Sequence, residues 1–209
     1  MTNVAVIYYS ATGNVHQLAQ AVAKGAEETG AQVRLRRVAE LAPDEAIDSR
    51  PEWRAHVEAT IDIPVATNDD LRWADGLALG SPTRFGNVSA QFKQFLDGAG
   101  PLWFVGELAD KVGTGFTSAG TRHGGNEATI LALYHTLYHW GAVVVAPGYT
   151  DPDAPAGGQS PYGTAHPSAD GPPGDDVLAA ARHQGRRLAT YAALVAGPRE
   201  PAPDTTPAG

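Results

Sequence analysis

The amino-acid sequence predicts an open, doubly wound α/β domain built on a five-stranded parallel sheet. Short apolar runs typical of buried strands alternate along the chain with segments whose apolar residues recur every three or four positions, as on one face of a helix. The chain has 209 residues, of which 43% are apolar and 18% charged. This composition suits one globular domain with a substantial core. No internal repeat is visible.

The first unit of the pattern is a strand, a helix and a second strand. Residues 4–9 form a continuous β-branched, aromatic and small apolar run, as expected of a strand buried on both faces. The apolar positions of the following helix, which ends near Gly30, are Val15, Leu18, Ala19, Val22 and Ala26. Residues 32–36 then alternate between polar and apolar, which indicates a strand exposed on one face. Such a βαβ unit makes its two strands parallel with a right-handed crossover.

The alternation continues to the end of the chain with one interruption. Residues 39–70 carry prolines among acidic residues, and we interpret them as an excursion with one short helix. The third, fourth and fifth strands are expected at residues 75–80, 111–117 and 142–146. Helices are expected at residues 89–96 and 126–139. A final helix, with Asp175 as its N-cap, has the apolar positions Val177, Ala181, Leu188, Tyr191, Ala192 and Val195.

Glycine and proline are concentrated in two segments. They fill 11 of the 24 positions of residues 151–174 and 6 of the 13 positions of residues 197–209. The first segment lies inside the predicted domain, residues 1–196, and is far longer than an ordinary connection, so we expect an ordered loop that contacts another subunit or covers the site. The second is expected to be a disordered tail.

The composition excludes several classes of protein. Without cysteine, the chain has no disulfide scaffold, thiolate metal site or catalytic thiol. A formal net charge of −8 disfavours a nucleic-acid partner, which needs a basic surface. No apolar run approaches the length of a membrane span, and residues 4–9 are too short for a signal sequence. We therefore expect a cytoplasmic protein without membrane insertion.

The loop after the first strand is a candidate phosphate site, because ligands of such sheets bind at the carboxyl ends of the strands. It places two hydroxyls and a glycine where a helix begins: Ser10, Ala11, Thr12, Gly13, Asn14 and Val15. The alternative is that Ser10 or Asn14 merely caps the helix. Neither the P-loop pattern nor G-x-G-x-x-G is present, so a monophosphate fits better than a pyrophosphate.

The loops after the third and fourth strands add other groups. The third-strand loop joins Thr83, Arg84 and Phe85, and a phenylalanine beside an arginine in so short a loop suggests a flat ligand. The alternative is that Phe85 anchors the loop to the core and Arg84 is solvated. The fourth-strand loop offers small residues and free amides, although it could be only a mobile turn: Ser118, Ala119, Gly120, Thr121, Arg122 and His123.

Metal and hydrolase chemistry are both disfavoured. His135 and His139 have the i, i+4 spacing of a zinc site on a helix, but no glutamate follows His135 and no third ligand is evident. Ser118 and Ser160 lack the flanking glycines of a nucleophile elbow. We therefore expect neither a metal ion nor a catalytic serine.

Several motifs carry a resemblance to a known family. They are V-x-V-x-Y-Y-S followed by Gly13, P-T-R-F-G-N at residues 82–87, F-L-D at 95–97, L-W at 102–103, S-x-G-T at 118–121, L-x-H-x-G at 137–141, G-Y at 148–149 and P-Y-G at 161–163. They span most of the chain, and P-T-R-F-G-N is specific. The sequence thus resembles the flavodoxin-like NAD(P)H:quinone oxidoreductases of the tryptophan-repressor-binding-protein (WrbA) type.

This resemblance implies the strand order 2-1-3-4-5, non-covalent FMN, and ping-pong reduction of quinones by NAD(P)H. Residues 10–15 would hold the FMN phosphate, residues 83–85 would line the isoalloxazine, residues 118–123 would cover its far edge, and His139 would lie close to the ring. Trp103 corresponds to the position facing the quinone, and Thr12 to one near the nicotinamide. The family forms homotetramers, dimers of dimers, in which neighbouring subunits complete each flavin site.

The sequence departs from the family at several of these positions. Thr12 stands where tyrosine is frequent, Arg122 and His123 stand where two glycines are common, and Trp140 replaces a second histidine. For His139, a purely structural hydrogen-bonding role is the alternative. The alternative function is a flavodoxin-type electron carrier that binds FMN without turnover. The acidic charge suits a carrier, but the length of the chain argues against one.

Overall fold

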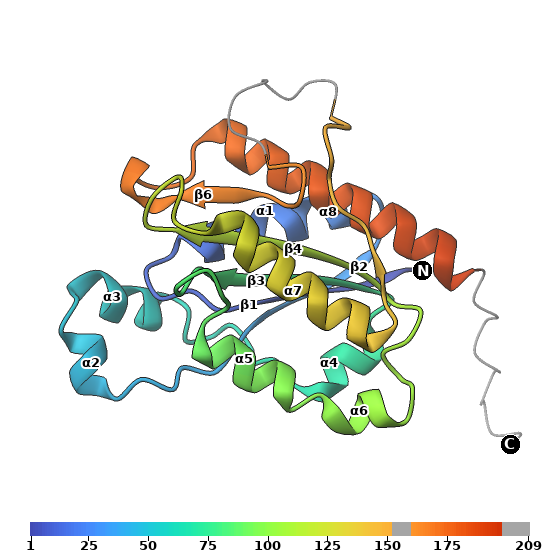
Figure 1. The fold of residues 1–209 in the computed structure, drawn as a ribbon, viewed down its shortest axis with the longest axis horizontal. Coiled ribbons are helices and arrows are strands. Elements are labelled where there is room, and N and C mark those ends of the chain that lie inside the picture. Colours follow the sequence, from blue (N-terminus) through green and yellow to red (C-terminus); the bar gives the residue numbers. More distant parts are fainter. Residues whose placement is uncertain (152–159, 198–209) are drawn as a thin grey trace, which may run out of the picture.

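A parallel sheet forms the centre of the computed structural model, which describes residues 1–151 and 160–197 (Figure 1). Its main strands are β1 (Asn3–Tyr8), β2 (Gln32–Arg37), β3 (Gly76–Pro82), β4 (Val112–Ala119) and β5 (Val143–Val144). They pair in the order β2-β1-β3-β4-β5, and every pairing is parallel. The predicted fold class and strand order are therefore confirmed.

Helices cover both faces of the sheet (Figure 1). Helices α1 (Asn14–Glu27) and α8 (Asp175–Ala196) pack on one face, over Val4, Val6 and Tyr8 of β1. The other face carries α4 (Asn68–Trp73), α5 (Ala90–Asp97), α6 (Gly100–Phe104) and α7 (Asn126–Trp140). Since successive side chains of a strand point to opposite faces, β1 contributes to both cores, as its unbroken apolar run predicted. None of the described helices is both long and apolar enough to cross a lipid bilayer.

The fifth strand is shorter than predicted. Instead of residues 142–146, only Val143–Val144 pair with β4, at residues 112–113. The far half of β4 is paired by another strand, β6 (Ala165–Pro167), which runs parallel to residues 117–119. Both β5 and β6 thus pair with the same edge of β4, and the glycine- and proline-rich segment supplies β6. Residues 152–159 of that segment lie outside the described residues.

The excursion at residues 39–70 holds more helix than the single short one predicted. It contains α2 (Asp44–Asp48), α3 (Pro51–Ala59) and the start of α4. The prediction treated the prolines as interruptions of helix. Instead, Pro43 is the N-cap of α2 and Pro51 occupies the first turn of α3, where a missing N–H costs nothing. A capping box between Thr67 and Asp70 then begins α4.

The ends of the long helices differ slightly from the sequence prediction. Helix α8 begins at Asp175, and the N-cap is Gly174, so the prediction of Asp175 as the cap is wrong. The side chain of Asp175 instead stands in the first turn, where a carboxylate complements the helix dipole. Residues 198–209, most of the predicted tail, lie outside the described residues.

Candidate functional site

The loop that joins β1 to α1, residues 10–15, is called here the phosphate loop. Gly13 is the N-cap of α1 and has φ +98°, a left-handed conformation that favours glycine. Its N–H donates to Ser10 Oγ at 3.1 Å, which closes the loop. Among the described residues no side chain caps the first turn of α1. The first N–H groups of the helix and its positive dipole end are thus left available, which favours anion binding over the capping alternative.

The loop after β3 is anchored at its start and exposed at its tip. Thr83 N–H donates to the Ser118 carbonyl oxygen at 2.8 Å, and the hydroxyl of Thr129 donates to that of Thr83 at 3.1 Å. Phe85 is fully exposed and has φ +51°, which is rare for an aromatic residue. The alternative that Phe85 anchors the loop to the core is therefore wrong. Arg84 beside it is also exposed.

The loop after β4 touches the loop after β3 through two glycines. Gly125 has φ +95°, and a Cβ atom there would lie 3.0 Å from Gly86 Cα, so the two backbones approach as closely as glycine permits. Ser118 and Ala119 are buried at the end of β4, whereas Gly120, Thr121, Arg122 and His123 are exposed. Because β1, β3 and β4 are neighbours in a parallel sheet, the three predicted loops meet at one sheet edge, on the left of Figure 1.

The outer side of the loop after β4 borders a cavity of about 680 Å³, whose lining includes Arg122, His123, Asn126 and His166. The Arg122 guanidinium lies 3.9 Å from the Asp170 carboxylate and is largely exposed. Asn126 is buried and donates to the Arg122 carbonyl oxygen at 3.3 Å. Its own Oδ1 is buried without a hydrogen-bond partner among the described residues. A polar atom left in this state marks the start of α7 as a place where a ligand or water is expected.

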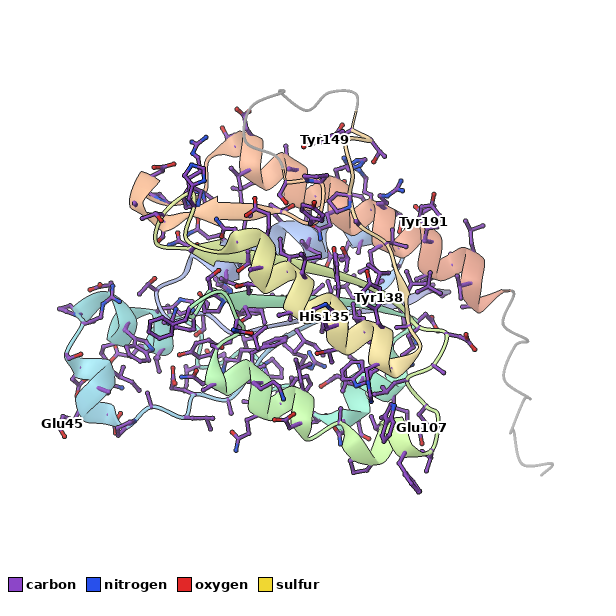
Figure 2. All side chains as sticks on the ribbon, in the orientation of Figure 1. Glu45, Glu107, His135, Tyr138, Tyr149 and Tyr191 are labelled. Carbon is purple, nitrogen blue, oxygen red and sulfur yellow. The ribbon has the colours of Figure 1, made fainter. Side chains whose placement is uncertain are left out.

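Trp103 and His139 lie together, but away from the three loops of the same chain. Their ring centroids are 5.3 Å apart, and the Trp103 indole N–H donates to the His139 carbonyl oxygen at 3.1 Å. His139 stands near the end of α7, thirteen positions after Asn126, which corresponds to roughly 20 Å along a helix. Figure 2 shows His135 and Tyr138 on this far part of α7. Within one chain, His139 therefore does not reach the loops that were expected to hold the flavin ring.

Two further histidines, which the sequence analysis did not single out, lie beside the phosphate loop. His16 of α1 and His56 of α3 have ring centroids 5.4 Å apart, and His16 Nδ1 shares a hydrogen bond of 2.7 Å with the Tyr8 hydroxyl. Burial, with His16 as a second cause, lowers the pKa of His56 to about 4. His56 comes from the excursion, whose irregular sequence offered no signal of where its helices would pack.

The described residues hold no metal site. Within residues 1–151 and 160–197, no three histidine, aspartate or glutamate side chains are grouped closely enough to bind a metal ion.

Comparison with known proteins shows the family to which the chain belongs. Residues 2–153 match the family model described as NADPH-dependent FMN reductase. A protein named NAD(P)H dehydrogenase (quinone) from Deinococcus radiodurans is 42% identical over 92% of this chain and 96% of its own length. A protein of the same name from Paracoccus denitrificans is 45% identical over 94% of this chain and 97% of its own length.

A solved structure shares the fold over nearly the whole chain. A protein from Agrobacterium tumefaciens described as a flavodoxin, WrbA-like protein, superposes with a TM-score of 0.66 at 28% identity, covering 92% of this chain and 98% of that protein. Fold and comparisons together define a flavodoxin-like protein of the FMN reductase class. More narrowly, the chain belongs to the WrbA-like NAD(P)H:quinone oxidoreductase family.

Proposed function

We propose that the protein binds FMN non-covalently at the edge formed by the three loops and reduces quinones with electrons from NAD(P)H. One observation carries this proposal. The first N–H groups of α1, just after Gly13, have no side-chain cap, and they lie at the same sheet edge as the loops after β3 and β4, the first of which exposes the ring of Phe85. The residues present fit FMN. The phosphate loop offers backbone N–H groups for one phosphate, and the loops after β3 and β4 offer a flat surface and free amides for a ring.

Three sets of residues would hold the cofactor. The phosphate would bind to Ser10, Ala11, Thr12, Gly13, Asn14 and Val15. The isoalloxazine would be lined by Thr83, Arg84 and Phe85. Its far edge would be covered by Ser118, Ala119, Gly120, Thr121, Arg122 and His123. Bound FMN supplies a two-electron relay from the nicotinamide of NAD(P)H to a quinone.

The protein residues serve mainly to bind and orient. The Thr83 hydroxyl, joined to Thr117 at 3.3 Å and to Thr129 at 3.1 Å, fixes the start of the loop after β3. Phe85 and Arg84, both exposed, present an aromatic face and a cation to a planar molecule. Thr12, half-buried beside Gly13, is the proposed contact near the nicotinamide.

We further propose a homotetramer, a dimer of dimers, in which a neighbouring subunit supplies Trp103 to the quinone and His139 to the flavin ring. The separation of these residues from the loops of their own chain supports this arrangement. So do the exposed apolar side chains beside them, Phe104, Val105 and Tyr138, which suit burial in a subunit interface. Neither nucleic acid nor membrane is part of the proposal.

The experiment that tests the function is a spectrum followed by steady-state kinetics. The purified protein, loaded with FMN, should show the flavin absorption bands and should oxidise NADH or NADPH when benzoquinone is present. A flavin spectrum without turnover would favour the flavodoxin-type carrier. Failure to bind FMN would contradict the proposal as a whole.

A further inference from the structure

His56 stands close to the position proposed for the FMN phosphate. Its Nδ1 lies 3.6 Å from the point where a Cβ atom on Gly13 would stand. Figure 1 shows α3, the helix that carries His56, beside the loop that joins β1 to α1. A segment far from the loop in sequence thus brings an imidazole against the glycine around which the loop turns.

The phosphate loop brings no cation of its own. Residues 10–15 contain neither lysine nor arginine, so backbone amides and the helix dipole are the attractions that the loop itself provides. The nearest part of β2 carries Arg37, but its guanidinium donates to the carbonyl oxygens of Ile63 at 3.0 Å and Ile61 at 3.4 Å. His16, the other histidine beside the loop, shares a hydrogen bond with the Tyr8 hydroxyl, so His56 is the imidazole that we assign to balance a bound phosphate.

Titratable groups of α1, β1 and β2 lie around His56. His16 faces it from α1, and a cavity of about 30 Å³ beside it is also lined by Tyr8, Tyr9, Arg37 and Glu40. With no anion bound, burial and His16 hold the pKa of His56 well below neutrality, and the imidazole is uncharged at pH 7. A phosphate dianion at the loop would act in the opposite direction, because a nearby negative charge favours the protonated imidazole.

We propose that His56 takes up a proton when FMN binds and donates a hydrogen bond to the flavin phosphate, so that α3 is part of the cofactor site. The proton comes from solvent, and FMN affinity is linked to pH through this residue. The inference rests on the proposed function, since it concerns the same cofactor. It goes further by assigning a phosphate-binding role to a residue of the excursion.

The test compares FMN with riboflavin, which has the same ring and no phosphate. Apoprotein of the wild type and of His56→Gln is titrated with each flavin at pH 8 and pH 6, and quenching of flavin fluorescence gives Kd. His135→Gln, an exposed histidine on α7, is the matched control. The titration of the free FMN phosphate changes the Kd for FMN of all three proteins equally, so it cancels in the ratio of their Kd values.

The expected result is specific to FMN. With a His56 pKa near 7 in the FMN complex, the ratio of the FMN affinity of the wild type to that of His56→Gln should grow about tenfold from pH 8 to pH 6. Riboflavin affinity should be the same in all three proteins at both pH values. His135→Gln should behave as the wild type does with both flavins.

Three results would overturn the inference, and they can be told apart. The same pH dependence of FMN affinity in the wild type and His56→Gln would remove the role of His56 while leaving FMN binding intact. An equal loss of riboflavin affinity in His56→Gln would place the effect away from the phosphate. A wild type that binds neither flavin would overturn the proposed function as well.

Calorimetry on the wild type alone provides a second measurement that does not depend on the variant. FMN binding at pH 7, measured in two buffers of different ionisation enthalpy, should show net proton uptake. Riboflavin binding should show none. Equal proton counts for the two flavins would overturn the inference.

Discussion

The indole of Trp103 packs on the imidazole of His139, with ring centroids 5.3 Å apart, at the opposite end of α7 from the loop after β4. Two side chains proposed to serve quinone and flavin thus form one cluster, held by the hydrogen bond from the indole to the His139 carbonyl oxygen. The cluster is partly exposed and borders apolar side chains that a second chain could cover. This geometry supports the proposal that the cluster acts in the site of another subunit.

Subunit mixing should therefore restore activity. One variant, Gly13→Val, has a disrupted phosphate loop, and the other, Trp103→Ala with His139→Ala, has an intact loop but no cluster. Each alone should reduce quinone poorly. In oligomers assembled from equal amounts of both, about a quarter of the sites should combine an intact loop with an intact cluster. The measurement is NADH-dependent quinone reduction by the mixed, co-expressed oligomer.

The controls decide what a negative result means. Size-exclusion chromatography should show the same oligomer for both variants, because a dissociated variant cannot complement. Full activity of the double alanine variant by itself would contradict the proposed role of Trp103 and His139. Two inactive variants that stay inactive when mixed would contradict sites shared between subunits.

Gly13→Ala should weaken FMN binding as well as the fold. An alanine at φ +98° costs about 1–2 kcal/mol, and the loop must keep that conformation to present its amides to the phosphate. We expect FMN affinity to fall about tenfold, measured by fluorescence quenching. Gly30→Ala is the matched control, because Gly30 has φ +84°, open space around its Cβ position and no part in the site.

The comparison of the two alanine variants separates backbone strain from site geometry. Both should lose similar stability to urea, since both force a left-handed conformation on alanine. Only Gly13→Ala should lose FMN affinity. An equal loss of FMN affinity in both variants would mean that the strain acts through the whole domain, and not at the phosphate loop.

The core strands could be predicted from sequence because their signal is local. The run from Val4 to Tyr9 shows a doubly buried strand without any knowledge of its partners. The three-residue strand β6 has no such signal, since Ala165–Pro167 becomes a strand only because the carboxyl half of β4 has an unpaired edge. The hydrogen bond from Thr117 N–H to the Thr164 carbonyl oxygen, at 3.0 Å, joins residues far apart in the sequence, so it could not be inferred from either segment alone.

The candidate site was predictable in its loops but not in its surroundings. Gly13 and Phe85 stand in loops whose place at the sheet edge follows from strand order, so sequence sufficed for them. The position of His56 depends instead on how α3 packs. That packing includes hydrogen bonds from Tyr9 and Trp53, residues separated by 44 positions, to the carboxylate of Glu40. Long-range polar contacts of this kind leave no periodic trace in a sequence.

Removal of the Glu40 charge should destabilise the protein. The Glu40 carboxylate accepts hydrogen bonds from the Tyr9 hydroxyl at 2.8 Å, the Trp53 indole at 3.0 Å and the Gln91 amide at 2.8 Å. It thereby joins the end of β1 to α3 and α5. In Glu40→Gln, an amide N–H₂ replaces one acceptor oxygen and faces these donors. We expect a loss of about 1–3 kcal/mol in unfolding free energy at pH 7, measured by urea denaturation.

The same carboxylate should make stability depend on pH. Burial alone would raise the pKa of Glu40, but hydrogen bonds from Ala42 N–H, Gln91, Tyr9 and Trp53 together lower it below its ordinary value of 4.5. A carboxyl whose folded pKa is lowered contributes stability above its unfolded pKa, and loses it as pH falls through the folded value. The difference in unfolding free energy between wild type and Glu40→Gln should thus be constant from pH 7 to about 5 and should shrink below 4.5.

Glu58→Gln is the matched control for this pH dependence, because Glu58 is exposed on α3. Its effect on unfolding free energy should stay within about 0.5 kcal/mol at every pH tested. A difference between wild type and Glu40→Gln that stays constant down to pH 3 would show that the charge of Glu40 is not what stabilises the network. The loss would then come from side-chain shape alone, and the packing of α3 beside the phosphate loop would not depend on ionisation.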